Sequence, residues 1–132
     1  MELMRRLYDH IDLRVRSLKE ARAFYEAVLP ALGFTRRMEV DGWLQFEAVG
    51  AGESTEFFGV TEARGHTANE CRIAFWAQST AEVDRLAHIV AEKGGRQIEG
   101  PGYLEGAGYY AVFFEDPSGN RLEICHRVAG AI

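Results

Sequence analysis

Hydrophobic and polar positions follow one order in the first half of the chain. Residues 7–16 alternate apolar and polar side chains with a period of two, which is typical of a strand with one buried face. Residues 18–29 carry apolar side chains at helical spacing. Pro30 predicts that this helix ends or kinks there, and Gly33 marks the turn that follows. The strands expected after it lie near residues 34–40, 43–49 and 54–60.

The second half repeats this order. A strand begins near Cys71, and a helix over about 80–93 is expected to stop at Gly94-Gly95. The glycine-rich segment 100–108 follows, either as a lid or as an ordinary surface loop. After it we expect a strand at 109–115, a tight turn at Asp116-Pro117-Ser118-Gly119 and a last strand at 120–128.

A shift of 62 residues relates the two halves. Ser17 with Glu20, and Ser79 with Glu82, both have the spacing of a helix capping box, and 79 − 17 = 62. In the last strand the shift is larger, because Gly52 corresponds to Gly119 and 119 − 52 = 67. The repeat predicts an α+β fold in which two βαβββ modules form a paired curved sheet around a cleft, with the helices outside.

Length and composition fit one domain over residues 1–132. Its parts would be module one at about 7–60, a linker at 61–70 and module two at about 71–128. The net charge of −5 argues against a nucleic-acid partner. A membrane-spanning helix needs about 20 residues without charges, and no charge-free stretch of this sequence approaches that length. We therefore expect a cytoplasmic protein with no membrane partner.

Strand parity selects the residues that face the cleft. The apolar positions of the first strand are odd-numbered, so His10 should face away from the helix, and Arg72 is its equivalent at a shift of 62. Glu56 and Glu123 correspond at a shift of 67. Three of these four are metal-ligand types. Parity also places Phe58 and Trp76 in the pocket, whereas Tyr110 there depends on the register of the last hairpin.

Several segments of the chain carry family motifs. The most specific is Asp116-Pro117-Ser118-Gly119-Asn120-Arg121-Leu122-Glu123. The others are Tyr8-Asp9-His10-Ile11-Asp12-Leu13-Arg14-Val15, Ala23-Phe24-Tyr25 to Leu32-Gly33-Phe34, Arg72-Ile73-Ala74-Phe75 and Tyr109-Tyr110-Ala111-Val112-Phe113. With these segments the chain resembles the vicinal-oxygen-chelate superfamily, which includes glyoxalase I, bleomycin-resistance proteins, fosfomycin-resistance enzymes and extradiol dioxygenases.

The resemblance implies a metal site. Its metal-binding members place His, Glu, His or Gln, and Glu at the four cleft positions, so it implies His10, Glu56 and Glu123 as ligands of Ni, Zn, Mn or Fe. Arg72 departs from that pattern, because a His or Gln would be expected there. In this interpretation the metal assists lyase, isomerase or dioxygenase chemistry on a small oxygen-bearing metabolite, with Glu123 or Glu56 as the catalytic base.

A metal-free interpretation stays open beside the first. Arg72 would pair with the carboxylates and fill the metal position, and the protein would bind and sequester a small molecule, as bleomycin-resistance proteins do. Arg72, Trp76, Tyr110 and Phe58 would then contact the ligand. An accessory module without chemistry is the third alternative. In each case a homodimer is expected, because two-fold dimers are the commonest closed oligomers.

Overall fold

The computed structural model describes residues 6–48 and 55–129, and these form two βαβββ modules. The α+β class and the order of elements expected from the sequence are confirmed. Module one contains β1 (His10–Val15), α1 (Leu18–Leu32), β2 (Arg36–Val40), β3 (Trp43–Glu47) and β4 (Phe57–Glu62). Module two contains β5 (Arg72–Trp76), α2 (Thr80–Glu92), β6 (Arg96–Gly102), β7 (Tyr109–Glu115) and β8 (Arg121–Arg127).

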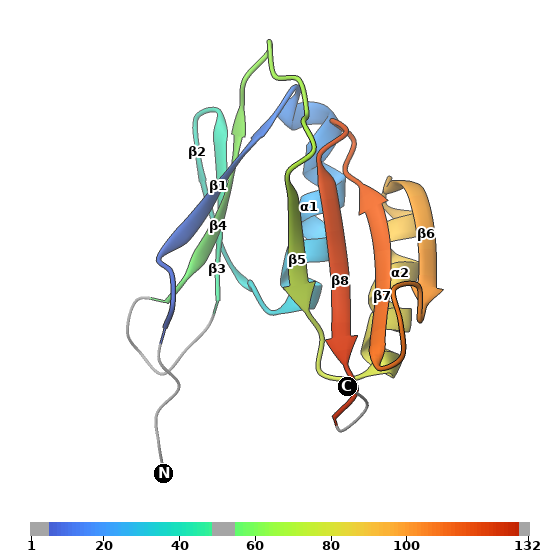
Figure 1. Cartoon of the computed structure of the whole chain (residues 1–132). Coiled ribbons are helices and arrows are strands. Elements are labelled where there is room, and N and C mark those ends of the chain that lie inside the picture. The colour runs from blue at the N-terminus through green and yellow to red at the C-terminus, as the bar shows by residue number, and fades with distance from the viewer. Residues whose placement is uncertain (1–5, 49–54, 130–132) are drawn as a thin grey trace.

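Each module forms its own four-stranded mixed sheet (Figure 1). The strand orders are β1-β4-β3-β2 and β5-β8-β7-β6, so the first and last strands of a module lie side by side in parallel. The other neighbours are antiparallel. The same topology in both sheets confirms the internal repeat.

The predicted capping boxes begin both helices. Ser17 Oγ accepts the backbone N–H of Glu20 at 3.2 Å, and Ser79 Oγ accepts that of Glu82 at 3.1 Å. The predicted end at Pro30 is wrong, because α1 continues through Pro30 to Leu32. Gly33 ends the helix in the left-handed conformation (φ 119°), with its N–H directed to the carbonyls of Leu29 and Pro30. Pro30 has no N–H to donate to the carbonyl of Glu26 four residues earlier, so the last turn lacks that hydrogen bond.

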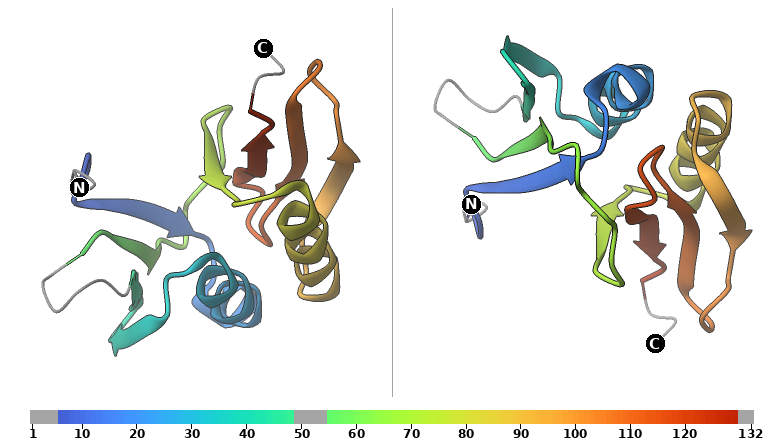
Figure 2. Two further views of the ribbon diagram at one scale, coloured as in Figure 1. Left: turned by 90° about the horizontal axis from the view of Figure 1, so that it is seen from below. Right: turned by 90° about the horizontal axis from the view of Figure 1, so that it is seen from above.

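The two modules share one core. The helices lie side by side in the angle between the two sheets (Figure 2), and each covers one face of its own sheet. Phe58 and Val60 of β4 belong to the same buried cluster as Phe75 of β5 and Ile124 of β8. The opposite face of each sheet carries no helix, and we call it the open face. The two open faces are turned away from the common core.

The register of the parallel pairs corrects the expected equivalence of the last strands. His10 pairs with Phe57, whereas Arg72 pairs with Arg121, so the shift between β4 and β8 is 121 − 57 = 64 rather than 67. Glu123 therefore corresponds to Gly59, which lies opposite Asp12. The expected shift of 67 differs from the observed 64 by three residues. An odd difference places a side chain on the opposite face of the sheet, so Glu56 lies on the helix side of its sheet and Glu123 on the open face.

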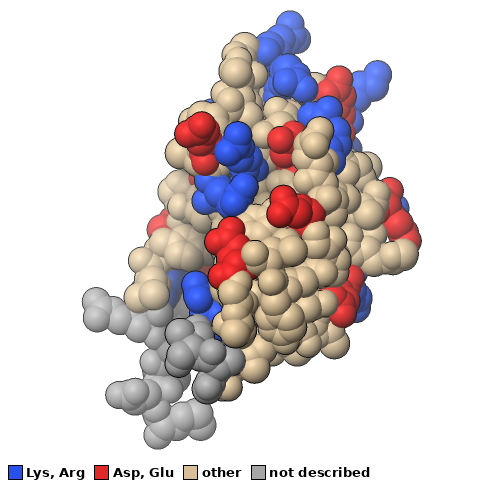
Figure 3. All heavy atoms as spheres, turned by 45° about the vertical axis from the view of Figure 1, so that its right-hand side comes forward, with Lys and Arg blue, Asp and Glu red and all other residues tan. Residues whose placement is uncertain are grey.

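The surface shows no broad region of one charge on the side of the molecule seen in Figure 3, where acidic and basic side chains are interspersed. The net charge of the whole chain is −5. Neither helix in the described part of the chain is long and apolar enough to cross a membrane.

Candidate functional site

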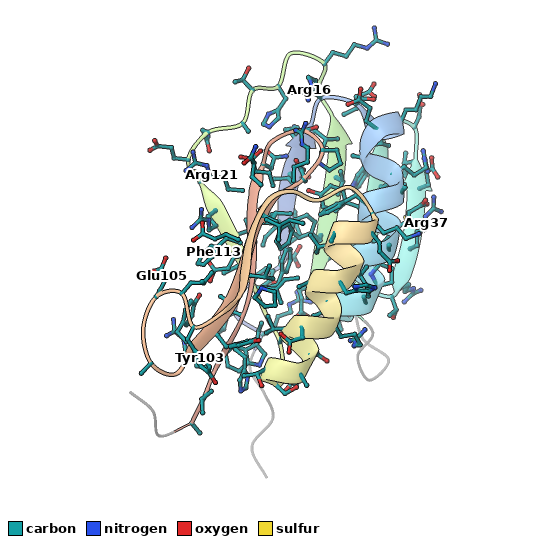
Figure 4. All side chains as sticks on the ribbon, turned by 90° about the vertical axis from the view of Figure 1, so that its right-hand side faces the viewer. Arg16, Arg37, Tyr103, Glu105, Phe113 and Arg121 are labelled. Atoms are coloured by element: carbon teal, nitrogen blue, oxygen red, sulfur yellow. The ribbon has the colours of Figure 1, made fainter. Side chains whose placement is uncertain are left out.

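A cavity of about 420 Å³ lies on the open face of the second sheet. Its walls come from three strands and one loop: Arg72, Tyr109, Phe113, Glu123 and Arg127, with Glu105 at the edge. Phe113 and Glu105 lie on the side of the sheet away from α2 (Figure 4). We call this cavity the arginine pocket. It brings a buried carboxylate and two guanidinium groups into one space.

Glu123 is the buried acid of the arginine pocket. Its residue is 5% exposed, and its neighbours across the sheet are Ala74 on β5 and Phe113 on β7. The hydroxyl of Tyr109 donates a hydrogen bond to Glu123 Oε2. Burial, together with Cys125 and Glu123, raises the pKa of Tyr109 far above its usual value, so the phenol keeps its proton. A protonated donor therefore faces the carboxylate.

Two arginines are held against aromatic rings in the same pocket. The guanidinium carbon of Arg72 lies 4.7 Å from the ring centre of Phe113, and that of Arg127 lies 4.5 Å from the ring centre of Tyr109. Neither forms an ion pair with a carboxylate in the described residues. The pairing of Arg72 with Glu123 expected in the metal-free interpretation is therefore not observed. Both guanidinium groups keep hydrogen-bond donors available for a ligand.

The glycine-rich segment forms one edge of the arginine pocket. Its first part belongs to β6, which extends to Gly102 and shifts register twice against β7. The rest forms the loop that places Glu105 and Ala107 at the cavity. Tyr103 and Leu104 of this loop are exposed apolar residues. The loop therefore borders the site.

The structure separates the predicted site residues into different places. Arg72 and Glu123 meet in the arginine pocket. Glu56 and Trp76 line a second cavity at the junction of the modules. His10 lies in neither: its ring stacks on Phe57 at 4.5 Å, and its Nδ1 is 2.8 Å from Asp9 Oδ2.

Two residues predicted to line the pocket lie on the helix side instead. Phe58 is 1% exposed in the core, where its ring contacts those of Tyr25, Phe34 and Phe75, because β4 has the register described above. The hydroxyl of Tyr110 donates to Asp84 Oδ1 of α2 at 2.6 Å. Tyr109, one residue earlier, faces the pocket.

The predicted metal ligands do not converge within the described chain. No three side chains of His, Cys, Asp or Glu in residues 6–48 and 55–129 lie close enough together to hold a metal ion. His10, Glu56 and Glu123 come from three separate surroundings. Arg72 brings a permanent positive charge to the one pocket that contains Glu123. The arrangement in one chain therefore does not fit a metal centre.

Sequence analysis did not select Glu105 and Ala107 of the loop that borders the arginine pocket, nor its three strand residues Tyr109, Phe113 and Arg127. The tight turn at Asp116–Gly119 sets Glu115 opposite Arg121, and this places Phe113 opposite Glu123 and Tyr109 opposite Arg127. Counting back from that turn would have found all three, because paired residues share a face.

Comparison with known proteins identifies the family. The model of the Glyoxalase/Bleomycin resistance protein/Dioxygenase superfamily matches residues 7–124. No curated protein matches the chain significantly. The crystal structure of a glyoxalase/bleomycin resistance protein from Albidiferax ferrireducens T118 has 25% identity and a TM-score of 0.74, covering 91% of this chain and 98% of that one.

A second solved structure extends the likeness in fold. The fosfomycin resistance protein FosX from Mesorhizobium loti has 19% identity and a TM-score of 0.65, and the alignment covers 96% of each chain. At this identity the likeness concerns the fold alone. The family match over residues 7–124, together with the paired βαβββ modules, shows that this chain belongs to the Glyoxalase/Bleomycin resistance protein/Dioxygenase superfamily.

Proposed function

We propose that this protein binds a small molecule with an anionic oxygen group, such as a carboxylate or a phosphonate, in the arginine pocket. One observation supports this: Arg72 and Arg127 line the same cavity, and neither is paired with an acid in the described chain. Guanidinium groups bind such oxygens through two parallel hydrogen bonds. The stacking on Phe113 and Tyr109 orients them before the ligand arrives.

Glu123 gives the bound molecule a second contact. A buried carboxylate beside a guanidinium-bound anion would repel that anion, so Glu123 is suited to face a hydroxyl or an acidic C–H of the same ligand. If the protein is an enzyme, Glu123 is the candidate base, and Tyr109 holds it by donating its hydroxyl proton. Glu123→Gln would then retain ligand affinity and abolish turnover.

Calorimetric titration tests the binding site. We expect phenylacetate to bind wild-type protein at one site per chain, while the neutral phenylacetamide binds at least tenfold more weakly. Arg72→Ala and Arg127→Ala should each lower phenylacetate affinity about 10–100-fold, which corresponds to about 1.5–3 kcal/mol for a hydrogen bond to a charged group. The control is Arg121→Ala. Arg121 lies on β8, the strand of Arg127, and is an exposed arginine that does not line the cavity.

Three outcomes would overturn this proposal: no phenylacetate binding, equal affinity for the acid and the amide, or equal loss in the Arg121 control. Repeating the titration with phenylphosphonate separates the two anion classes. A gain for the phosphonate that depends on both arginines would favour a phosphonate ligand, because its third oxygen can reach the second guanidinium.

We also propose that the chain forms a homodimer through the open face of the first sheet. This face presents Met38, Val40 and Phe57 beside charged residues, and Met38 and Val40 are 54% and 48% exposed. Apolar side chains gathered on one sheet face are typical of an interface. Light scattering should give twice the chain mass of 14.8 kDa, and Met38→Glu should shift it to the monomer. A wild-type monomer at all concentrations would contradict the proposal.

A further inference from the structure

The second cavity has a volume of about 490 Å³ and lies where the two modules meet. Its wall combines β1, the segment after α1 and β5. The apolar side chains that form it are Ile11, Phe34, Ile73 and Phe75. Each of them also packs on the core, so the wall is fixed by the fold. The cavity is therefore a built pocket rather than a groove between mobile side chains, and we call it the junction pocket.

The junction pocket has few polar groups, and its one charged group is negative. Glu56 is the only charged side chain in its lining, and its carboxylate makes no ion pair or hydrogen bond with a side chain of the described residues. Tyr8 lies beside it: burial and the negative charge of Glu56 raise the pKa of the Tyr8 phenol. Trp76 is 50% exposed and lines the same cavity.

The junction pocket differs from the arginine pocket in the charge of its lining, which is negative here, and in its apolar wall. A carboxylate that has no side-chain partner among the described residues, with two aromatic rings nearby, attracts a cation through charge and through the ring faces. The apolar wall beneath these groups favours a hydrocarbon body on the same ligand. We propose that the junction pocket is a second binding site, for a small apolar molecule with a protonated amine. This site is independent of the anion bound in the arginine pocket.

Three probes of one shape test the proposal on the full-length protein. They are 4-phenylbutylamine, the neutral 4-phenylbutan-1-ol and the anionic 4-phenylbutyrate, each titrated by calorimetry. We expect the amine to bind at one site per chain and at least tenfold more tightly than the alcohol. Glu56→Gln should remove that advantage and leave the affinity for the alcohol unchanged. The matched control is Glu99→Gln, an exposed acid outside the cavity, which should change nothing.

Two further variants locate the bound amine. Ala48 lines the cavity, so Ala48→Leu should fill part of it and weaken amine and alcohol alike. Arg72→Ala should leave amine binding unchanged, because Arg72 lines only the other pocket. A melting curve of each variant checks that it is folded. The proposal is overturned if the amine does not bind, if amine and alcohol bind equally, or if Glu56→Gln keeps the advantage. Failure of phenylacetate to bind would leave it standing.

Discussion

Gly59 lies in the middle of β4, on the open face of the first sheet and opposite Asp12. A Cβ atom built on it would come within 3.1 Å of both Asp12 Oδ1 and Trp43 Nε1. The indole N–H of Trp43 is buried and has no hydrogen-bond partner among the described residues. The absence of a side chain at Gly59 therefore leaves space for the indole nitrogen of Trp43 and the carboxylate of Asp12.

Replacing Gly59 with valine should destabilise the protein by about 1–3 kcal/mol, because the branched side chain must displace the indole of Trp43. Urea unfolding followed by circular dichroism measures this difference. The control is Gly65→Val, where nothing lies within 4 Å of the added Cβ and φ is not positive. Equal stability of the two variants would show that Trp43 moves aside without cost.

The direction of a side chain could be predicted where it depended on one strand, and not where it depended on how two strands pair. The alternation within β1 and β5 placed His10 and Arg72 on the open faces. Predicting the direction of Glu56 required the residue shift between β4 and β8. The match of Gly52 with Gly119 gave a shift of 67, which is wrong by three residues and therefore assigns Glu56 to the wrong face. Gly52 lies outside the described residues. An insertion in a loop changes the position of a glycine in the sequence without changing which residues of the neighbouring strands are paired, so a loop glycine is a poor marker of strand register.

At the scale of elements, an ion-pair network fastens α1 to β2. Both guanidinium nitrogens of Arg22 on the helix donate to Glu39, at 2.9 and 2.8 Å. Arg37 bonds the same carboxylate at 2.7 Å and Glu26 at 2.6 Å. Hydrogen bonds from Arg22 and Arg37 lower the pKa of Glu39 from its ordinary value of 4.5 to about 2. This outermost strand has no buried residue of its own, so the network is its main side-chain contact with the helix.

Acid titration should detect this network. Because the pKa of Glu39 is lower in the folded protein, its contribution is complete above pH 4.5 and is lost as the pH falls toward 2. The melting temperature of wild type should therefore fall more steeply than that of Glu39→Gln between these values. The two curves should meet near pH 2. High salt should reduce the difference, since the groups are exposed. Parallel curves would show that Glu39 adds nothing.

Elements with local signals were predicted well, and those shaped by neighbours were not. Each helix start follows from a capping box whose atoms are all within four residues. α1 does not end at Pro30, where the sequence allowed an end or a kink, but at Gly33, which the sequence marked as the turn. By contrast, β6 enters a glycine-rich segment because it can pair with β7, and a partner strand is not visible in local sequence.

On the scale of the whole molecule, a buried network joins the two modules. Asp116, in the last turn of module two, is fully buried, and its carboxylate accepts the Tyr25 hydroxyl of α1 at 2.5 Å. The same carboxylate accepts the backbone N–H groups of Ser118 and Asn120 at 2.8 and 2.9 Å. Asn120 also donates to the carbonyl of Arg14 at 2.8 Å. The most specific sequence motif of the family thus serves as a joint in this chain.

The joint includes two further contacts. His66, in the linker between the modules, has its Nε2 2.8 Å from Asn120 Oδ1, so it supports the turn rather than the pocket. Ser118 accepts the backbone N–H of Arg16 at 2.9 Å, just before α1 begins. These contacts fix the hairpin of β7 and β8 against module one. That hairpin carries Tyr109, Phe113 and Glu123, so the joint positions the arginine pocket.

A substitution in one module should therefore lower the stability of the other. Asp116→Asn replaces an acceptor surrounded by donors with an amide, and should destabilise the protein by about 2–3 kcal/mol. In a Trp76→Phe background, Trp43 of module one is the single tryptophan. We expect its fluorescence midpoint in urea to fall together with the circular dichroism midpoint, in one transition, because both modules share one core. The control Glu115→Gln, whose side chain makes no hydrogen bond in the described chain, should leave both midpoints near wild type. If the Trp43 midpoint stays at the wild-type value while the dichroism changes, the modules fold independently and Asp116 acts only within its own turn.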